Sequence, residues 1–140
     1  MKRRCGRVIW WALAPLLTAS WAAGTEMQAI RGTLTVAADL AHHIGPDDRL
    51  IIKLYHPKDG VELDATFQIV PRFELPLEFL AAPSVDMSGR TKFDAYVLEL
   101  FTDKDDNVLG TAPGELLART LDPVPLGTTG LQLELNASRE

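Results

Sequence analysis

The chain has 140 residues, of which 14 are basic and 19 acidic, so its formal net charge is −5. This length suits one domain with its own hydrophobic core and leaves no room for a second domain of ordinary size. Because the excess of acidic side chains repels phosphate backbones, the sequence predicts no nucleic-acid partner.

The first residues have the three-part pattern of a secretory signal. Four basic residues lie within residues 2–7, an apolar run follows at 8–17, and small residues come next at 20–24. An uncleaved membrane anchor is the alternative, but the apolar run is shorter than the roughly 20 residues of a membrane span, and Pro15 interrupts it. We predict a cleaved signal peptide at residues 1–22, with residue 24 as the alternative end. The prediction implies a periplasmic protein that has no membrane span after cleavage.

Cleavage would change the chemistry of the chain. It removes Cys5, the only cysteine, and leaves 10 basic and 19 acidic residues, a net charge of −9. The mature chain then has no thiol for a disulfide, a metal site or a nucleophile. Such a surface suits a cationic partner, although negative charge more often only promotes solubility. The predicted division is a linker at 23–29, a β-domain at 30–136 and a tail at 137–140.

Apolar and polar residues alternate with period two along most of the mature chain, which predicts β-strands. In chain order, the predicted strands are residues 30–36, 49–55, 61–69, 73–79, 93–102 and 131–135, with one or two short strands around 116–121 and 124–126. The alternation is clearest in the third of these. There the residues predicted to face the core are Val61, Leu63, Ala65, Phe67 and Ile69.

Other residues predict how these strands are arranged. Pro76 cannot donate a ladder hydrogen bond, so the strand at 73–79 is expected at an edge or a bulge. Residues 93–102 are apolar on both faces, which is typical of a central strand. Residues 37–43 are expected to form one or two helical turns. Short strands joined by Gly and Pro turns indicate an all-β fold, and we predict an antiparallel immunoglobulin-like β-sandwich of about seven strands.

Candidate metal ligands are few. His42, His43 and His56, together with Met27 and Met87, are residue types that a copper site uses. Adjacent histidines point apart on a strand or helix, however, so exposed loop histidines are the simpler interpretation. No metal ligand is therefore assigned.

The acidic run at residues 103–107 looks at first like the start of a calcium loop. An EF-hand needs Gly at its sixth position and Glu at its twelfth, whereas this chain has Val108 and Gly114 there. A polar hairpin loop between two strands is the simpler interpretation.

No catalytic constellation is evident in the sequence. Glu74, Glu78 and Glu99 lie on or near apolar strands, and a partly buried Glu99 would have the raised pKa that acid–base catalysis uses. Pairing with a basic side chain is the commoner role of such a carboxylate. The serines have no G-x-S-x-G elbow around them, at Ser84, Ser88 or Ser138. We therefore predict that the protein is not an enzyme, and assign no catalytic and no cofactor-binding residues.

Several segments follow one another in a recognisable order. They are an opening strand and short segment at 30–40, the lead into a second strand at 46–50, a Leu-Pro strand at 73–79, a long hairpin at 93–114 and a closing segment at 123–135. In this order and spacing, the mature chain resembles the C-terminal periplasmic domain of the CycH-type subunit of the cytochrome c maturation system. The resemblance implies an assembly factor that helps to hold apocytochrome c for covalent heme attachment.

The resemblance also has departures. Members of that family carry transmembrane segments and a helical repeat region, which this sequence does not show, and their methionine-rich stretch is reduced here to residues 84–89. We hypothesise a periplasmic, non-catalytic binding or assembly module whose partner is a protein or peptide, with copper binding as the alternative. The edge near Pro76 is the predicted docking site for a strand-forming peptide, which would bind by adding a strand to the sheet.

Overall fold

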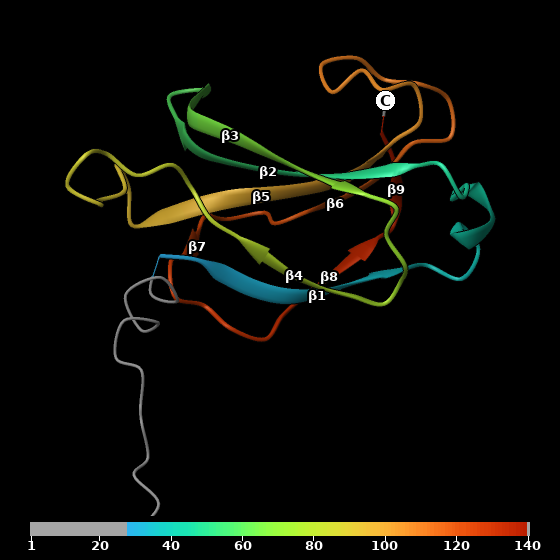
Figure 1. Ribbon diagram of the computed structural model, residues 1–140, viewed down its shortest axis with the longest axis horizontal. Coiled ribbons are helices and arrows are strands. Elements are labelled where there is room, and N and C mark those ends of the chain that lie inside the picture. Colours follow the sequence, from blue (N-terminus) through green and yellow to red (C-terminus); the bar gives the residue numbers. More distant parts are fainter. Residues whose placement is uncertain (1–27, 140) are drawn as a thin grey trace, which may run out of the picture.

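The computed structural model describes residues 28–139, and Figure 1 shows them as two layers of β-strands. The predicted signal peptide, Met27 and Glu140 lie outside the described residues. Within them the elements are β1 (Ile30–Val36), η1 (Ala41–His43), β2 (Arg49–Lys58), β3 (Val61–Pro71), β4 (Leu77–Ala81), β5 (Ala95–Asp103), β6 (Leu116–Arg119), β7 (Val124–Pro125), β8 (Leu131–Leu135) and β9 (Ala137–Ser138). The all-β prediction is confirmed.

The strands form two sheets that face each other. The small sheet has the order β4-β1-β8, and the large sheet has the order β3-β2-β5-β6-β9, with β7 also paired to β5. The central position of the strand at 93–102 is confirmed, because β5 pairs with β2 and β6. The edge position of the strand that follows Pro76 is also confirmed, since β4 pairs only with β1.

The prediction of an antiparallel fold is wrong at one place, because β1 and β8 run parallel. Parallel neighbours need a long connection, and here nearly the whole domain separates the two strands. The chain returns to the small sheet beside the beginning of β1. There Gly127 N donates to Ala29 O at 2.9 Å and Arg31 N donates to Thr128 O at 2.9 Å. From this point β8 runs alongside β1 in the same direction.

The main core lies between the sheets. It is built from the inward-facing residues of both layers: Ile30, Leu34, Leu50, Ile52, Leu54, Phe79, Ala81, Tyr96, Leu98, Leu100, Leu116, Ala118 and Leu135. Along β1 and β2 these residues alternate with outward-facing ones, so the period-two pattern predicted their burial correctly, and β5 is buried on both faces as its sequence predicted. Their removal from water is the principal stabilising contribution to the fold.

Strand β3 contradicts the predicted facing of its apolar residues. Thr66, Gln68 and Val70 are half-buried, whereas Phe67 is 42% and Ile69 49% exposed. The reason is a β-bulge, since the register with β2 shifts between Leu54 and His56. One extra residue reverses the alternation, so residues after the bulge turn their apolar side chains outward.

Three shorter segments also differ from their predicted form. The strand predicted at 73–79 begins only at Leu77, and the helical turns predicted at 37–43 reduce to the short 3₁₀ helix η1. The predicted tail at 137–140 contains β9, which pairs with β6. A strand of two residues is too short to show a period, so the sequence pattern missed it.

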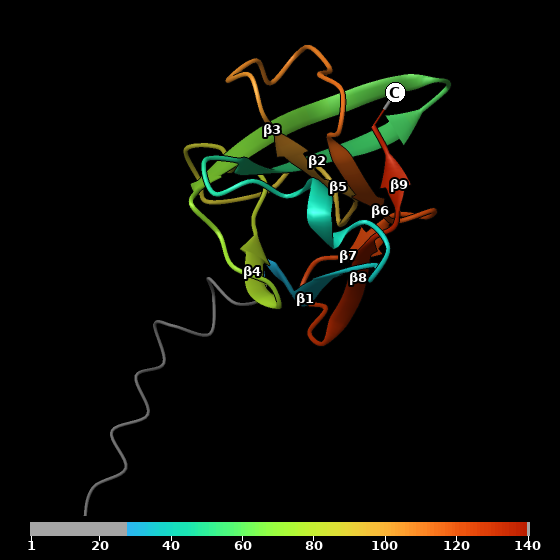
Figure 2. The same cartoon turned by 90° about the vertical axis from the view of Figure 1, so that its right-hand side faces the viewer.

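The two sides of the sandwich differ, as Figure 2 shows. On one side the chain passes from β8 in the small sheet directly into β9 in the large sheet, and Asn136 N donates to Leu117 O at 3.3 Å. On the other side lie β3 and β4, which are edge strands of different sheets and are not paired with each other. The sandwich is therefore joined along one side and open along the other.

Candidate functional site

The structure does not gather the three histidines into one site. His42 and His43 lie in η1 before β2, with ring centroids 4.2 Å apart, whereas His56 lies near the end of β2. The His56 ring stacks on Phe93 at 4.0 Å between centroids, and its Nδ1 lies 2.9 Å from Ala95 O. Met87 is fully exposed. These contacts give His56 a packing role.

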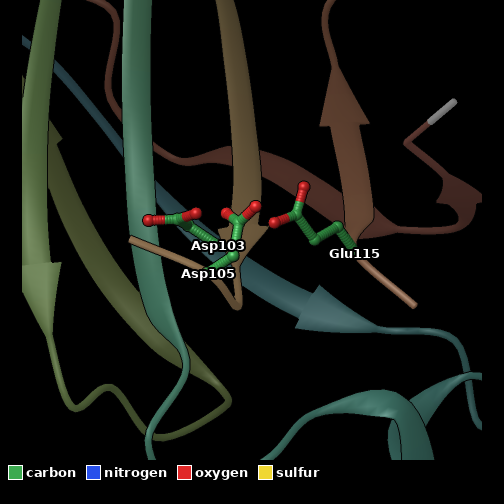
Figure 3. A group of neighbouring side chains, drawn as sticks. All are labelled: Asp103, Asp105 and Glu115. Carbon is green, nitrogen blue, oxygen red and sulfur yellow. The ribbon is translucent and has the colours of Figure 1, made fainter. Parts of the chain in front are cut away.

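Three carboxylates do come together in the described chain. They belong to Asp103 at the end of β5, Asp105 in the following loop and Glu115 before β6, and one oxygen of each lies within 4.8 Å of the others (Figure 3). Asp103 and Glu115 are 1% and 0% exposed. The prediction that residues 103–107 form a polar loop is therefore wrong for Asp103, which is buried at the end of β5. No short-range sequence pattern pairs residues 103 and 115, so sequence reasoning missed this cluster.

Arginines neutralise both buried carboxylates. Arg49 donates to Asp103 Oδ2 from Nε at 2.9 Å and, at closer range, from Nη2. This hydrogen bond is the main cause that raises the pKa of Arg49 above its ordinary value. Arg139 Nη1 donates to Glu115 Oε2 at 3.0 Å, and its guanidinium lies 3.7 Å from the centre of the Phe101 ring.

The same cluster ties the loop at 104–114 to the C-terminal segment. Arg139 also donates to the backbone carbonyls of Gly110 at 2.7 Å and Val108 at 3.2 Å. Oxygen ligands of this kind suit hard cations, but here Arg49 and Arg139 already occupy Asp103 and Glu115. Of the oxygens of these two buried carboxylates, only Asp103 Oδ1 has no hydrogen-bond partner. The chemistry of the arrangement is that of a buried ion-pair cluster.

Glu99, the carboxylate that the sequence singled out, is paired. It accepts a hydrogen bond from Tyr55 Oη at 3.1 Å and lies 3.4 Å from Arg119 Nε and 3.8 Å from Lys53 Nζ. Burial first, and then the charge of Glu99, raise the pKa of Tyr55. The other residues considered for catalysis are exposed: Glu74, Glu78, Ser84, Ser88 and Ser138.

The outer face of the large sheet carries an apolar row across four strands. Register places Ile69 beside Ile51, Ile51 beside Phe101, and Phe101 beside Leu117. Ile51 and Phe101 are 0% and 1% exposed, although neither belongs to the core between the sheets. We call these four residues the outer row. Arg139 covers the outer row at Phe101, and the row is exposed at Ile69, its residue in β3.

Polar groups frame the β3 end of this row. Lys53 Nζ lies 2.6 Å from Glu62 Oε2 and 5.8 Å from the centre of the Phe67 ring. Phe67 and Ile69 therefore form an exposed apolar pair, bordered by charges, on an edge strand. Apolar side chains bordered by polar groups are one kind of surface on which proteins bind partners.

A side chain of β3 forms hydrogen bonds to the edge of β4. Gln68 Nε2 donates to Leu80 O at 3.2 Å, and Ala82 N donates to Gln68 Oε1 at 3.1 Å. Two residues away, on the same face of β3, Thr66 Oγ1 is buried and has no hydrogen-bond partner. We call the space between these two edges the β3–β4 seam.

No protein-family model and no curated protein matches this sequence. Among solved structures, the chain is similar to an alternative pilotin from the type II secretion system of Vibrio cholerae, with 16% sequence identity and a TM-score of 0.50. The match covers 81% of this chain and 98% of the pilotin chain. At this identity the similarity concerns the fold. None of the helices in residues 28–139 is long and apolar enough to cross a membrane.

Proposed function

We propose that this protein is an exported, non-catalytic binding module for another protein, acting in the assembly of a larger complex. The observation that carries the proposal is the exposed pair Phe67 and Ile69, which continues the outer row at the edge of the large sheet. Full burial of such a side chain contributes about 1.5–3 kcal/mol, and a partner that covers these two, which are 42% and 49% exposed, recovers the part still lost to water.

The polar clusters support a binding role over a catalytic one. The buried carboxylates Asp103 and Glu115 are held by arginines, and Glu99 is held by Tyr55 and Arg119. These contacts use the carboxylates to position strands and loops. The copper alternative draws no support from the described residues, because His56 lies apart from His42 and His43 and is packed on Phe93.

The partner class is proposed from two similarities. The CycH-type resemblance suggests apocytochrome c or a component of the heme-attachment complex. The structural neighbour is a pilotin of a type II secretion system, which suggests a secretion-system component instead. Both similarities concern components of larger assemblies, and we propose cytochrome c maturation as the first setting to test.

The export step is part of the proposal. It is supported by the basic, apolar and small-residue pattern of residues 1–24. We also propose that the fold is immunoglobulin-like. The two facing sheets support the layered arrangement of such a fold.

A binding assay with paired variants tests the function. Apocytochrome c peptides and purified secretion-system components would be titrated against the mature protein and against a Phe67→Lys/Ile69→Lys double variant. We expect the double variant to lose at least about tenfold in affinity, because lysines cannot be buried unpaired at an interface.

Leu121→Lys is the matched control, since Leu121 is 95% exposed and lies outside the outer row. The control should bind as the parent protein does. Equal binding by the double variant, with its fold verified by circular dichroism, would contradict the proposal.

A further inference from the structure

We infer that the β3–β4 seam is a strand-addition site, at which an extended cationic segment of a partner protein pairs with β3 along one edge and, along its other edge, takes the place of the Gln68 side chain on β4. This inference rests on the proposed function and specifies how the partner binds. It concerns the backbone edge of β3, whereas the proposed function requires only its exposed apolar side chains.

Both strands of the seam offer a backbone edge. In the described chain, β3 pairs only with β2 and β4 only with β1, so the opposite edge of each strand has no ladder. β3 is also long, with 11 residues. Unpaired N–H and C=O groups along such an edge are a template for another strand.

Gln68 already occupies the place of a peptide group on β4. Its amide donates to Leu80 O and accepts from Ala82 N, two backbone groups that flank Ala81 on one edge of the strand. A neighbouring strand would present the same donor and acceptor to these groups. The side-chain amide is therefore a local substitute for a backbone that can replace it.

Thr66 supplies a second, independent indication. Its hydroxyl is buried on the face of β3 that carries Gln68, yet makes no hydrogen bond. Buried polar groups are nearly always hydrogen-bonded in folded proteins. An extended segment in the seam would bring donors and acceptors to this hydroxyl.

The chemistry of the occupant follows from the side chains and the charge. An added strand would place alternate residues beside Phe67 and Ile69 on the outer face, where apolar residues fit. Residues 28–139 contain 17 acidic and 10 basic side chains, which favours a segment with positive charge on its other residues. The same charge disfavours a second copy of this chain as the occupant.

The probe is an acetylated, amidated peptide of roughly ten alternating lysines and valines, the length of a long strand. Its control carries N-methyl groups on alternate residues, which remove the backbone donors of one edge and keep every side chain. Both peptides would be titrated by NMR against the labelled mature protein, with amide exchange followed along β3 and β4.

We expect saturable binding that protects amides within residues 65–70, with the methylated peptide at least about tenfold weaker because its ladder cannot form. Gln68→Ala should bind the probe about fivefold more tightly, since the two hydrogen bonds of Gln68 need not be broken first. Gln132→Ala, at an exposed glutamine of β8, is the matched control and should leave the affinity unchanged.

Three outcomes would overturn the inference. If both peptides bind equally and Phe67→Lys/Ile69→Lys abolishes binding, the apolar surface binds proteins but strand addition is wrong. If the probe leaves the β3 amides unprotected, while apocytochrome or secretion-system partners still bind, only the seam is excluded. If the free protein dimerises with protected β3 edges, the occupant is a second copy.

Discussion

Arg139 connects three parts of the folded domain. It is the charge partner of the fully buried Glu115, it donates to two loop carbonyls, and it covers the Phe101 ring. An arginine can do all three because its planar guanidinium donates in several directions and stacks on aromatic faces. Residues 137–139 therefore form part of the folded domain.

We predict that Arg139→Ala destabilises the protein by about 3 kcal/mol, because removing one partner leaves the buried Glu115 carboxylate uncompensated. Urea unfolding measures the loss. Adding Glu115→Gln to this variant should restore part of the stability, and Arg90→Ala, at an exposed arginine, should change it by less than about 0.5 kcal/mol. A loss as small for Arg139→Ala as for Arg90→Ala would contradict the assignment.

Tyr96 gives a pH dependence with a defined sign. Burial first, and then its hydrogen bond to Asp64 at 2.7 Å, raise the pKa of Tyr96 to about 12. An unfolded tyrosine has a pKa of about 10. Below pH ~10 Tyr96 is protonated in both the folded and the unfolded protein, so its contribution to stability is complete. Between pH ~10 and ~12 only the unfolded protein releases the proton, and this contribution is lost as the pH rises.

A spectrophotometric titration of the Tyr55→Phe variant tests this directly, because the chain has two tyrosines and Tyr96 alone would remain. We expect the phenolate signal to rise near pH 12 in the folded protein and near ~10 in urea. A midpoint near ~10 for both states would show that Tyr96 is not buried against Asp64.

At the scale of the elements, the bulge in β3 decides which side chains the edge strand presents. Asp64 adopts φ of 52°, and this left-handed conformation inserts the extra residue and directs the carboxylate to the Tyr96 hydroxyl in the core. Asp tolerates such a backbone better than most residues. The exposure of Phe67 and Ile69 follows from this one residue.

Gly32 in β1 has a comparable effect in the small sheet. A Cβ at this position would overlap the carbonyl oxygen of Leu131 and lie 2.7 Å from Cζ of Phe79. We predict that Gly32→Ala costs about 3 kcal/mol in thermal or urea unfolding, since a backbone atom and a packed ring would have to move. The neighbouring Thr33→Ala should cost less than about 1 kcal/mol. If both substitutions lowered the free energy of unfolding equally, the backbone of β8 would not lie as close to Gly32 as the structure has it.

At the scale of the whole molecule, the sandwich is asymmetric. The passage from β8 to β9 joins the sheets on one side, and the side chain of Gln68 bridges β3 and β4 on the other. The central strands β2 and β5 are paired on both edges and together supply six of the 13 residues of the main core. Local opening should therefore begin at the seam and reach the centre last.

Native-state hydrogen exchange tests this order. We expect amides on the free edges of β3 and β4 to exchange through low-energy openings, and those of β2 and β5 only on global unfolding. Gln68→Ala should accelerate exchange at Ala82 N, which loses its acceptor, without affecting β5. Uniform protection across β3 and β5 would contradict an open side.

The sequence by itself determined the all-β class, the inward faces of β1 and β2, the central place of β5 and the edge place of β4. These features depend on period-two alternation and on proline, which are properties of neighbouring residues. Only the tertiary structure decided the outward face of β3, the parallel pairing of β1 with β8, and the burial of Asp103 and Glu115 beside their arginines. The bridge from Gln68 to β4 belongs to the same group. Each of these depends on one inserted residue or on contacts between segments far apart in the chain, which local periodicity does not encode.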